Sequence, residues 1–331
     1  MMRRRDDVDD YRVRVRPGKG SRPRTKVRPN YSDAPRGMVT SVDRGRYGVV
    51  MDDGVRLTAV KAREIGKGNV VVGDRVALVG DLSGVKDTLA RIVQIDERAH
   101  VLTRSAEDGD AAGNERAVVA NATILGIVVA LADPPPRTGL IDRFLVAAYD
   151  AAMRPLLILT KSDLADPDEF LASYSALDLD VVTTKLDGDE IGGIDAVRGH
   201  LSGTVSVLVG HSGVGKSTLV NALVPSADRA TGSVNVVTGK GRHTSSSAVA
   251  LELPGGGWVI DTPGIRSFGL AHISPDDLLR GFDDLAVVAE ECPRGCTHAA
   301  DSPDCAMDEW AADDIRAARL SSYRRLLANV S

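Results

Sequence analysis

The sequence predicts three folded parts: a small N-terminal β-barrel, a central α/β region with a parallel sheet, and a C-terminal helical region that contains a cysteine cluster. Three observations predict this division. Short β-rich runs follow a basic arm, strands and helices then alternate, and every cysteine falls in one window near the end. We expect the arm at 1–34, the barrel at 35–105, the α/β region at 106–268 and the helical region at 269–331.

Length and composition indicate a soluble globular protein of two or three domains. The chain has 331 residues, of which 43% are hydrophobic and 26% are charged. Its longest apolar run, Ile124 to Ala132, is far shorter than a membrane span, and no apolar segment follows the first arginines. We therefore expect a cytoplasmic protein with no membrane partner. We also expect it to be a monomer.

Positive charge is concentrated in the arm. Residues 1–30 hold eleven Lys or Arg and four Asp, although the whole chain has a net charge of −5. The arm is rich in Arg, Pro and Gly and has no apolar periodicity, so we expect no packed core there. Such a segment favours phosphate backbones through counterion release. It could contact RNA, or it could serve only as a solubilising tail.

The barrel is predicted from five short β-rich runs. Asp53-Gly54 is a hairpin signal between the second and third runs. Five short strands suggest the oligonucleotide-binding type of barrel, and an SH3-like barrel that only packs on its neighbour is the alternative. The expected strands are 37–42, 46–51, 55–59, 75–79 and 90–96.

The α/β region is predicted from alternating strand and helix patterns after a polar linker at 107–115. Strand 124–132, helix 140–152 and strand 156–159 read as a parallel βαβ unit. The alternation then continues to form a doubly wound sheet, whose sites lie at the carboxyl ends of the strands. The segment 117–121 follows the linker. The other expected elements are strands 181–184, 205–209, 248–253 and 257–260, and helices 168–176, 194–201 and 216–223.

A glycine loop between strand 205–209 and helix 216–223 has the pattern of a phosphate-binding loop. Backbone amides of such a loop surround a polyphosphate, Lys216 reaches the outer phosphates, and Ser217 ligates Mg²⁺. A plain glycine-rich turn is the alternative. The loop and the first helical residues are Gly210, His211, Ser212, Gly213, Val214, Gly215, Lys216, Ser217 and Thr218.

A second loop, Thr160-Lys161-Ser162-Asp163, follows strand 156–159 and predicts selection of guanine. The Asp163 carboxylate can accept from guanine N1–H and from the exocyclic amine, a donor pair that adenine lacks, while the stem of Lys161 packs on the ring. An ordinary helix-cap aspartate is the alternative.

The order of the two loops indicates a circularly permuted GTPase. The base loop lies about fifty residues before the phosphate loop, whereas ordinary GTPases have the reverse order. A site depends on which strands are neighbours in space, so one pocket can be assembled from a rotated strand order.

Two further segments are candidates for sensing the terminal phosphate. In Asp261-Thr262-Pro263-Gly264, the aspartate can hold Mg²⁺ through water and the Gly264 amide can meet the phosphate. Thr244, in a polar segment, is the candidate switch threonine for Mg²⁺, although a Ser-rich surface loop is the alternative. Ile265 stands where many GTPases place a water-positioning glutamine, so we expect slow intrinsic hydrolysis. His243 could orient water or could simply be solvated.

The C-terminal region combines helices with a metal-ligand pattern. Ser274-Pro275 begins a helix, a second short helix follows, and a helix is expected over 307–328. Cys292, Cys296, His298 and Cys305 provide three thiolates and an imidazole, which predicts a closed, structural Zn²⁺ site; free thiols are the alternative.

Taken together, these motifs resemble the ribosome small subunit-dependent GTPase A family (RsgA or YjeQ). The resemblance runs from about Pro35 to the end and is most specific at Gly210–Thr218, Gly241–Thr244, Asp261–Gly264 and the cysteine cluster. It implies an N-terminal oligonucleotide-binding barrel, a permuted GTPase domain and a C-terminal zinc domain. It also implies GTP hydrolysis that the small (30S) ribosomal subunit stimulates, contact with its rRNA, and a role in its late maturation.

The chain departs from the family pattern at three places. Thr160 replaces the usual asparagine that braces the pocket, His211 replaces a usual glutamine, and the cysteine spacing is altered by a residue. Thr183 and Thr184 lie where a backbone contact to guanine O6 is expected. The alternative functions are an RNA-binding assembly module with a structural guanine nucleotide, and a P-loop ATPase or kinase, against which Asp163 argues.

Overall fold

The computed structural model describes residues 30–65, 70–104, 116–187, 190–225, 248–262 and 273–330. The chain divides into two compact units, Met1–Asp33 and Ala34–Ser331, and the elements below all belong to the second. Residues 1–29 of the expected basic arm and the expected linker at 107–115 lie outside the described residues.

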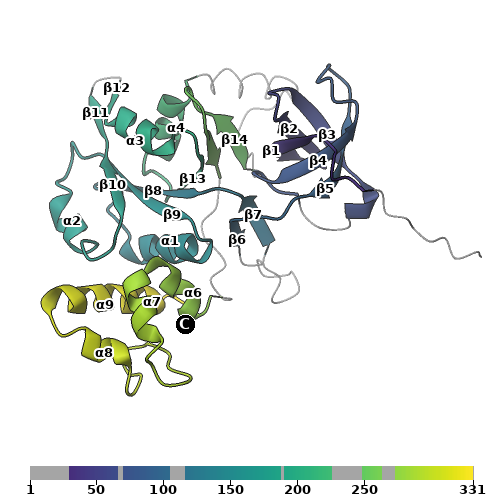
Figure 1. Ribbon diagram of the computed structural model, residues 1–331. Helices are drawn as coiled ribbons and strands as arrows, with labels where there is room; N and C mark the ends of the chain where they lie inside the picture. Colours follow the sequence, from purple (N-terminus) through teal and green to yellow (C-terminus); the bar gives the residue numbers. More distant parts are fainter. Residues whose placement is uncertain are drawn as a thin grey trace, which may run out of the picture. The chain divides into compact units, whose positions relative to one another are not determined.

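Five strands form the predicted N-terminal barrel (Figure 1). Hydrogen bonding follows the order β1-β2-β3-β5-β4, and β4 pairs with β1 to close the barrel. This arrangement agrees with the oligonucleotide-binding type and confirms the expected barrel. Its interior contains Val39, Leu78 and Ile92, which are fully buried. The strands are β1 (Arg36–Asp43), β2 (Arg46–Met51), β3 (Arg56–Lys61), β4 (Arg75–Gly80) and β5 (Ala90–Ile95), with a 3-10 turn η1 (Arg63–Ile65) after β3.

A two-stranded hairpin connects the barrel to the α/β region. β6 (Val101–Arg104) pairs antiparallel with β7 (Arg116–Ala120). Leu102 and Val119 are buried in the cluster that surrounds the first long helix, not in the barrel interior. β6 was not expected from the sequence, and it lies on the barrel side of the boundary that we expected at 105.

The α/β region contains the predicted doubly wound sheet. Five strands run parallel in the order β10-β9-β8-β13-β15, and β14 joins the end antiparallel. Every residue of β8 is buried, because both faces of a parallel sheet are covered. The strands are β8 (Ile124–Ala130), β9 (Arg154–Thr160), β10 (Asp180–Thr183), β13 (Val205–Val209), β14 (Val249–Glu252) and β15 (Trp258–Asp261).

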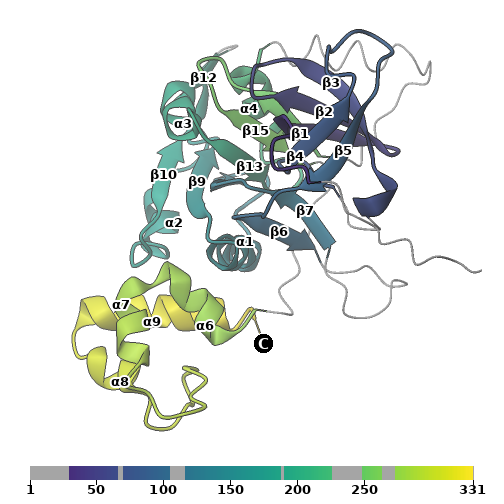
Figure 2. The ribbon, with the colours of Figure 1, turned by 45° about the vertical axis from the view of Figure 1, so that its right-hand side comes forward.

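Helices cover both faces of this sheet (Figures 1 and 2). α1 (Thr138–Asp150) packs on the face that carries Leu125, while α3 (Ile194–Leu201) and α4 (Lys216–Leu223) pack on the opposite face with Ile124. α2 (Asp168–Ala172) is shorter than the predicted helix 168–176, because residues 173–177 continue as turns. A small hairpin of β11 (Lys185–Asp187) and β12 (Glu190–Gly192) was not expected.

The C-terminal region is helical, as predicted. It contains α6 (Pro275–Leu278), η2 (Leu279–Gly281), α7 (Asp283–Ala289), α8 (Ala306–Trp310) and α9 (Asp314–Leu327). The single helix expected over 307–328 is wrong. The Asp313 side chain accepts a hydrogen bond from the Arg316 amide and caps a new helix, so the chain breaks between α8 and α9.

The barrel and the sheet of the α/β region are joined edge to edge. β1 pairs antiparallel with β14 through Ser41 and Val249, which makes one continuous eleven-stranded sheet. Within the described ranges, no helix is both long enough and apolar enough to cross a lipid bilayer.

Candidate functional site

The glycine loop joins β13 to α4, as the sequence predicts. Gly213 and Gly215 have φ of +86° and +87°, which side chains with a Cβ rarely adopt. A Cβ at Gly210 would lie 2.5 Å from the carbonyl oxygen of Val128. The loop therefore needs glycine at these three positions, and it ends at the N-terminus of an eight-residue helix, which favours an anion.

The carboxyl ends of the parallel strands meet at one edge of the sheet. β9 ends at Thr160, β10 ends at Thr183, β13 leads into Gly210, and β15 ends at Asp261. Because these strands are parallel and neighbouring, all of the described predicted loops lie along this one edge. The unusual order of the loops along the chain therefore does not separate them in space.

A direct contact links the base loop to the phosphate loop. The hydroxyl of Thr160 donates to the Val214 carbonyl oxygen across 2.7 Å, and Thr160 is 7% exposed. Its sequence neighbour Lys161 has a φ of +59° and donates from Nζ to the Asp133 carbonyl oxygen. The Thr160 hydroxyl therefore braces the phosphate loop.

The two segments predicted to contact guanine are hydrogen-bonded to each other. The amide and the hydroxyl of Ser162 both donate to the Thr184 carbonyl oxygen, each across 3.2 Å. Thr184 is buried, and its amide donates to Leu159 across 2.7 Å. The exposed Asp163 accepts from the Leu186 amide through Oδ1 at 3.4 Å.

The lysine and the aspartate predicted near the outer phosphates form an ion pair. Lys216 Nζ contacts Asp261 Oδ1, and the two side chains are 16% and 29% exposed. The hydroxyl of Thr262, 3% exposed, donates to Leu208 across 3.2 Å and fixes the end of β15 against β13. The pair therefore brings the two predicted phosphate-side groups together.

Ser217 and Thr218 are exposed in the first turn of α4, and His211 Nδ1 lies 2.8 Å from the Ser212 carbonyl oxygen. His243, Thr244 and Gly264, with Ile265, lie outside the described residues.

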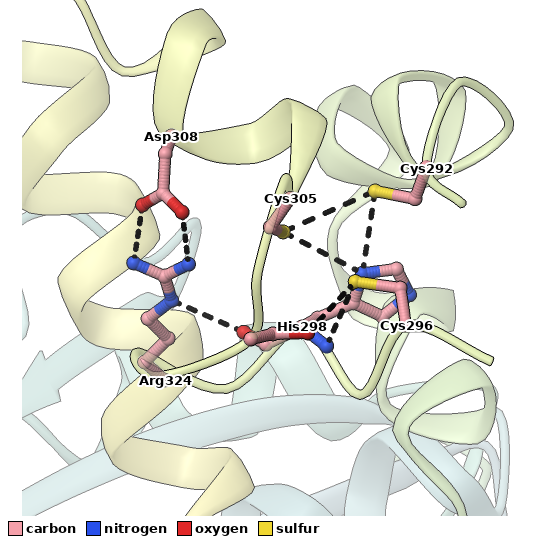
Figure 3. A network of polar contacts seen from close by, with 7 residues as sticks. Cys292, Cys296, His298, Cys305, Asp308 and Arg324 are labelled. Carbon is pink, nitrogen blue, oxygen red and sulfur yellow. Dashed lines mark hydrogen bonds and ion pairs between the residues drawn. The ribbon is translucent and has the colours of Figure 1, made fainter. Parts of the chain in front are cut away.

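The four predicted metal ligands converge at the other candidate site (Figure 3). The ligand atoms of Cys292, Cys296, His298 and Cys305 all lie within 4.8 Å of one another. Cys292 Sγ is 3.9 Å from Cys305 Sγ and 3.6 Å from His298 Nδ1. Zn–S bonds of about 2.3 Å in a tetrahedron place two sulfurs about 3.8 Å apart. The residues therefore fit a tetrahedral metal ion with His298 binding through Nδ1, despite the altered cysteine spacing.

Local backbone geometry and burial prepare these groups for a metal. Gly295 and His298 have positive φ, and the His298 amide donates to Cys296 Sγ at 3.4 Å. Burial lowers the pKa of His298, which favours the neutral imidazole that ligates metals. Burial also raises the pKa of the Cys305 thiol to about 11, so a cation is needed to hold the thiolate.

Arg324 supports the metal loop from outside. Its guanidinium donates to the His298 carbonyl oxygen at 3.1 Å and to both carboxylate oxygens of Asp308 at 2.7 and 3.1 Å (Figure 3). The bidentate pair fixes α9 against α8 and so holds the loop between the ligands.

The contacts that Asp133, Thr262 and Arg324 make were not predicted from the sequence. Asp133 and Lys161 are 28 positions apart along the chain, and Thr262 and Leu208 are 54 apart. Arg324 and His298 are 26 apart. Contacts over such separations leave no local pattern. The turn signal at Asp133-Pro134 was visible, but it does not indicate a lysine partner.

Comparison with known proteins shows the family to which the chain is similar. The family model described as RsgA GTPase matches residues 95–271. A "Small ribosomal subunit biogenesis GTPase RsgA" of Ectopseudomonas mendocina (strain ymp) is 41% identical over 67% of this chain and 66% of its own length. The protein of the same name from Pseudomonas aeruginosa (strain LESB58) is 39% identical over 79% of this chain and 76% of its own.

Two solved structures share the fold. The crystal structure of YjeQ from Thermotoga maritima superposes with a TM-score of 0.65 at 27% identity, covering 89% of this chain and 98% of that one. YloQ, described as a circularly permuted GTPase, has a TM-score of 0.63 at 22% identity, with 91% and 96% covered. With the permuted loops on one sheet edge and the Cys₃His cluster in the C-terminal region, the chain belongs to the RsgA GTPase family.

Proposed function

We propose that this protein hydrolyses GTP in the biogenesis of the small ribosomal subunit, slowly alone and faster when bound to that subunit. The observation that carries the proposal is the hydrogen bond from Thr160 to Val214. It holds the base loop against the phosphate loop, so one nucleotide can occupy both. Relatives named small ribosomal subunit biogenesis GTPase support the cellular role.

Recognition of the nucleotide is assigned to the predicted loops. Asp163 accepts from guanine N1–H and the exocyclic amine, with Ser162 and Thr184 holding the two base-side segments together. Lys216 exchanges Asp261 for the outer phosphates, while Ser217 and Thr244 would hold Mg²⁺ and Asp261 its water shell. Bound Mg²⁺ supplies charge neutralisation at the phosphates.

Hydrolysis is expected to depend on the partner. Ile265 offers neither a donor nor an acceptor to the attacking water, and His243 is the nearest candidate in the sequence for that task. We expect the small subunit to act on the segments that contain His243, Thr244 and Gly264.

The remaining parts are assigned to binding and stability. We assign Zn²⁺ to the Cys₃His cluster, because four protein ligands leave no open position for a reacting water. The barrel, together with the basic arm, would contact rRNA. The protein would act as a cytoplasmic monomer on the ribosomal subunit.

The decisive test is GTP turnover measured against increasing concentrations of purified 30S subunits. We expect phosphate release to rise with subunit concentration, and Ser217→Ala to abolish that rise while retaining the fold. Turnover that stays unchanged in the presence of subunits would defeat the proposal. Tight guanine binding without turnover would instead support an assembly module with a structural nucleotide.

Base selection has its own test. Asp163→Asn replaces the carboxylate acceptor with an amide that can donate to the extra carbonyl of xanthine. We expect this variant to lose GTP turnover and gain turnover of xanthosine triphosphate. Equal binding of GDP and ADP by the unaltered protein would contradict Asp163 as the selecting residue.

A further inference from the structure

Arg319 of α9 reaches out of the C-terminal region to the turn that follows α2. Its Nη1 donates to the Ala176 carbonyl oxygen across 2.9 Å, while Nε and Nη2 contact Asp284 at 3.2 and 3.1 Å. The guanidinium also lies 4.5 Å from the centre of the Phe282 ring, and the side chain is 17% exposed. The guanidinium therefore contacts a carbonyl oxygen, a carboxylate and an aromatic ring at once.

Arg325 makes a second contact with the same turn. Its Nη1 donates to the Ser173 carbonyl oxygen across 2.8 Å, and its guanidinium lies 4.8 Å from the centre of the Tyr174 ring. Its Nε lies 3.3 Å from Asp142 Oδ2 of α1, a side chain that is 4% exposed. Two arginines of one helix thus hold carbonyl groups of one turn, residues 173–177, which we call the α2 turn.

The α2 turn lies between the two segments assigned to guanine. It follows Asp163 along the chain through α2, and it precedes Thr183 and Thr184 through β10. Ser162 and Thr184, at the two ends of this stretch, are joined by hydrogen bonds. A nucleotide bound at Asp163 and helix α9 bound at the α2 turn would therefore restrain the same stretch of chain, from Ser162 to Thr184.

We propose that the α2 turn is a docking surface for α9, through which bound guanine nucleotide and the docked metal-binding region stabilise each other. This rests on the proposed guanine site. When two partners order one segment, the second to bind loses less conformational entropy than the first. The effect is reciprocal: the factor by which docked α9 strengthens nucleotide binding equals the factor by which bound nucleotide strengthens docking of α9.

The test measures release of a fluorescent GDP analogue from the full-length, metal-loaded protein. Arg319→Met removes the donors to Ala176 and Asp284 but keeps an unbranched stem over Phe282. We expect release about five-fold faster than from the unaltered protein, at the lower end of usual coupling between sites. The matched control is Arg316→Met, because Arg316 lies on the same helix but contacts Asp313 and Trp310; its release rate should not change.

Hydrogen exchange provides the second readout. GDP, but not ADP, should slow exchange in the α2 turn and in α9, and Arg319→Met should abolish the slowing in α9. Release that is equally fast from Arg319→Met and the unaltered protein, while exchange shows α9 detached, would overturn the proposal. Absence of GDP binding by the unaltered protein would instead defeat the proposed function.

A second variant covers the case in which Arg319→Met loses its metal or its fold. Arg325→Met combined with Asp142→Asn removes both charges of the ion pair, so the buried Asp142 site keeps no uncompensated charge. This variant should also release the GDP analogue about five-fold faster. Unchanged release from it, with α9 exchange increased, would likewise overturn the proposal.

Discussion

The barrel and the C-terminal helices differ in where they place their hydrophobic side chains. Val39, Leu78 and Ile92 belong to a cluster made only of residues from the barrel part of the chain. Phe282 and Tyr323, by contrast, lie in the same cluster as Phe144 of α1. The barrel therefore has an interior of its own, whereas the C-terminal region shares one with the α/β region.

Their attachments to the α/β region differ in the same way. The barrel is joined through backbone pairing of β1 with β14, a backbone bridge between Val72 and Val119, and an exposed ion pair between Arg56 and Glu252. The C-terminal region is joined through packing, because a Cβ at Gly281 would lie 2.3 Å from the Tyr149 ring. A substitution in the barrel interior should therefore destabilise the barrel alone, whereas a substitution in the core of the C-terminal helices should also destabilise α1.

Removal of the metal should have the largest effect. Structural zinc contributes on the order of 10 kcal/mol to the folding of small metal domains. We expect chelation, or Cys305→Ser, to unfold α8 and α9 while the barrel stays folded. Hydrogen exchange of α9 and of β4 would measure this, and equal loss of protection in β4 would contradict the comparison.

Truncation of the shared core should have the next largest effect. Phe282 is fully buried, with ring centres 5.7 Å from Tyr149 and 5.3 Å from Tyr323. Phe282→Ala should lower the free energy of unfolding by about 3 to 5 kcal/mol and increase exchange in both α1 and α9.

The matched change in the barrel is Leu78→Ala. It should cost about 2 to 5 kcal/mol, with faster exchange confined to the barrel strands. If Phe282→Ala left α1 protected, the two regions would not share a core in solution.

Asp142 should make the attachment of α9 sensitive to pH. Burial raises the pKa of Asp142 above its ordinary value of 3.8, although Arg325 opposes the shift. The folded chain therefore keeps the Asp142 carboxyl protonated to higher pH than the unfolded chain does. The contribution of this proton to the free energy of unfolding is complete below pH 3.8 and is lost as pH rises through the folded-state pKa.

Asp142→Asn removes that titration. Urea unfolding followed at α9 should show the stability of the unaltered protein falling relative to the variant as pH rises from about 4. Parallel pH dependences of the two proteins would show that Asp142 has no raised pKa.

The smallest effect is expected at the barrel attachment. Arg56 and Glu252 are 60% and 52% exposed, and Arg56 also lies 5.7 Å from the centre of the Trp258 ring. Arg56→Ala should lower the free energy of unfolding by less than about 1 kcal/mol. A thermal melt would detect a larger loss, which would mean that side chains, and not backbone pairing, hold the barrel in place.

Much of the fold was predictable because its signals are local. The short strands of the barrel, the buried run of β8 and the glycines before Lys216 are each visible within a few residues. The break between α8 and α9 was not predicted, because a cap at Asp313 and an uninterrupted helix are both compatible with the sequence there. β6 was missed because its partner, β7, lies beyond the expected linker.

The sequence by itself determined which chemical groups the candidate sites contain: an acid at Asp163 that we assign to guanine, a lysine at Lys216 that we assign to phosphate, and three thiols with an imidazole that could hold a metal. Their identities follow from residue type and short spacing. Only the tertiary structure decided that Thr160 braces Val214 and that α9 holds the α2 turn. These contacts join residues far apart along the chain, and the strand order and helix packing that bring them together depend on the whole core.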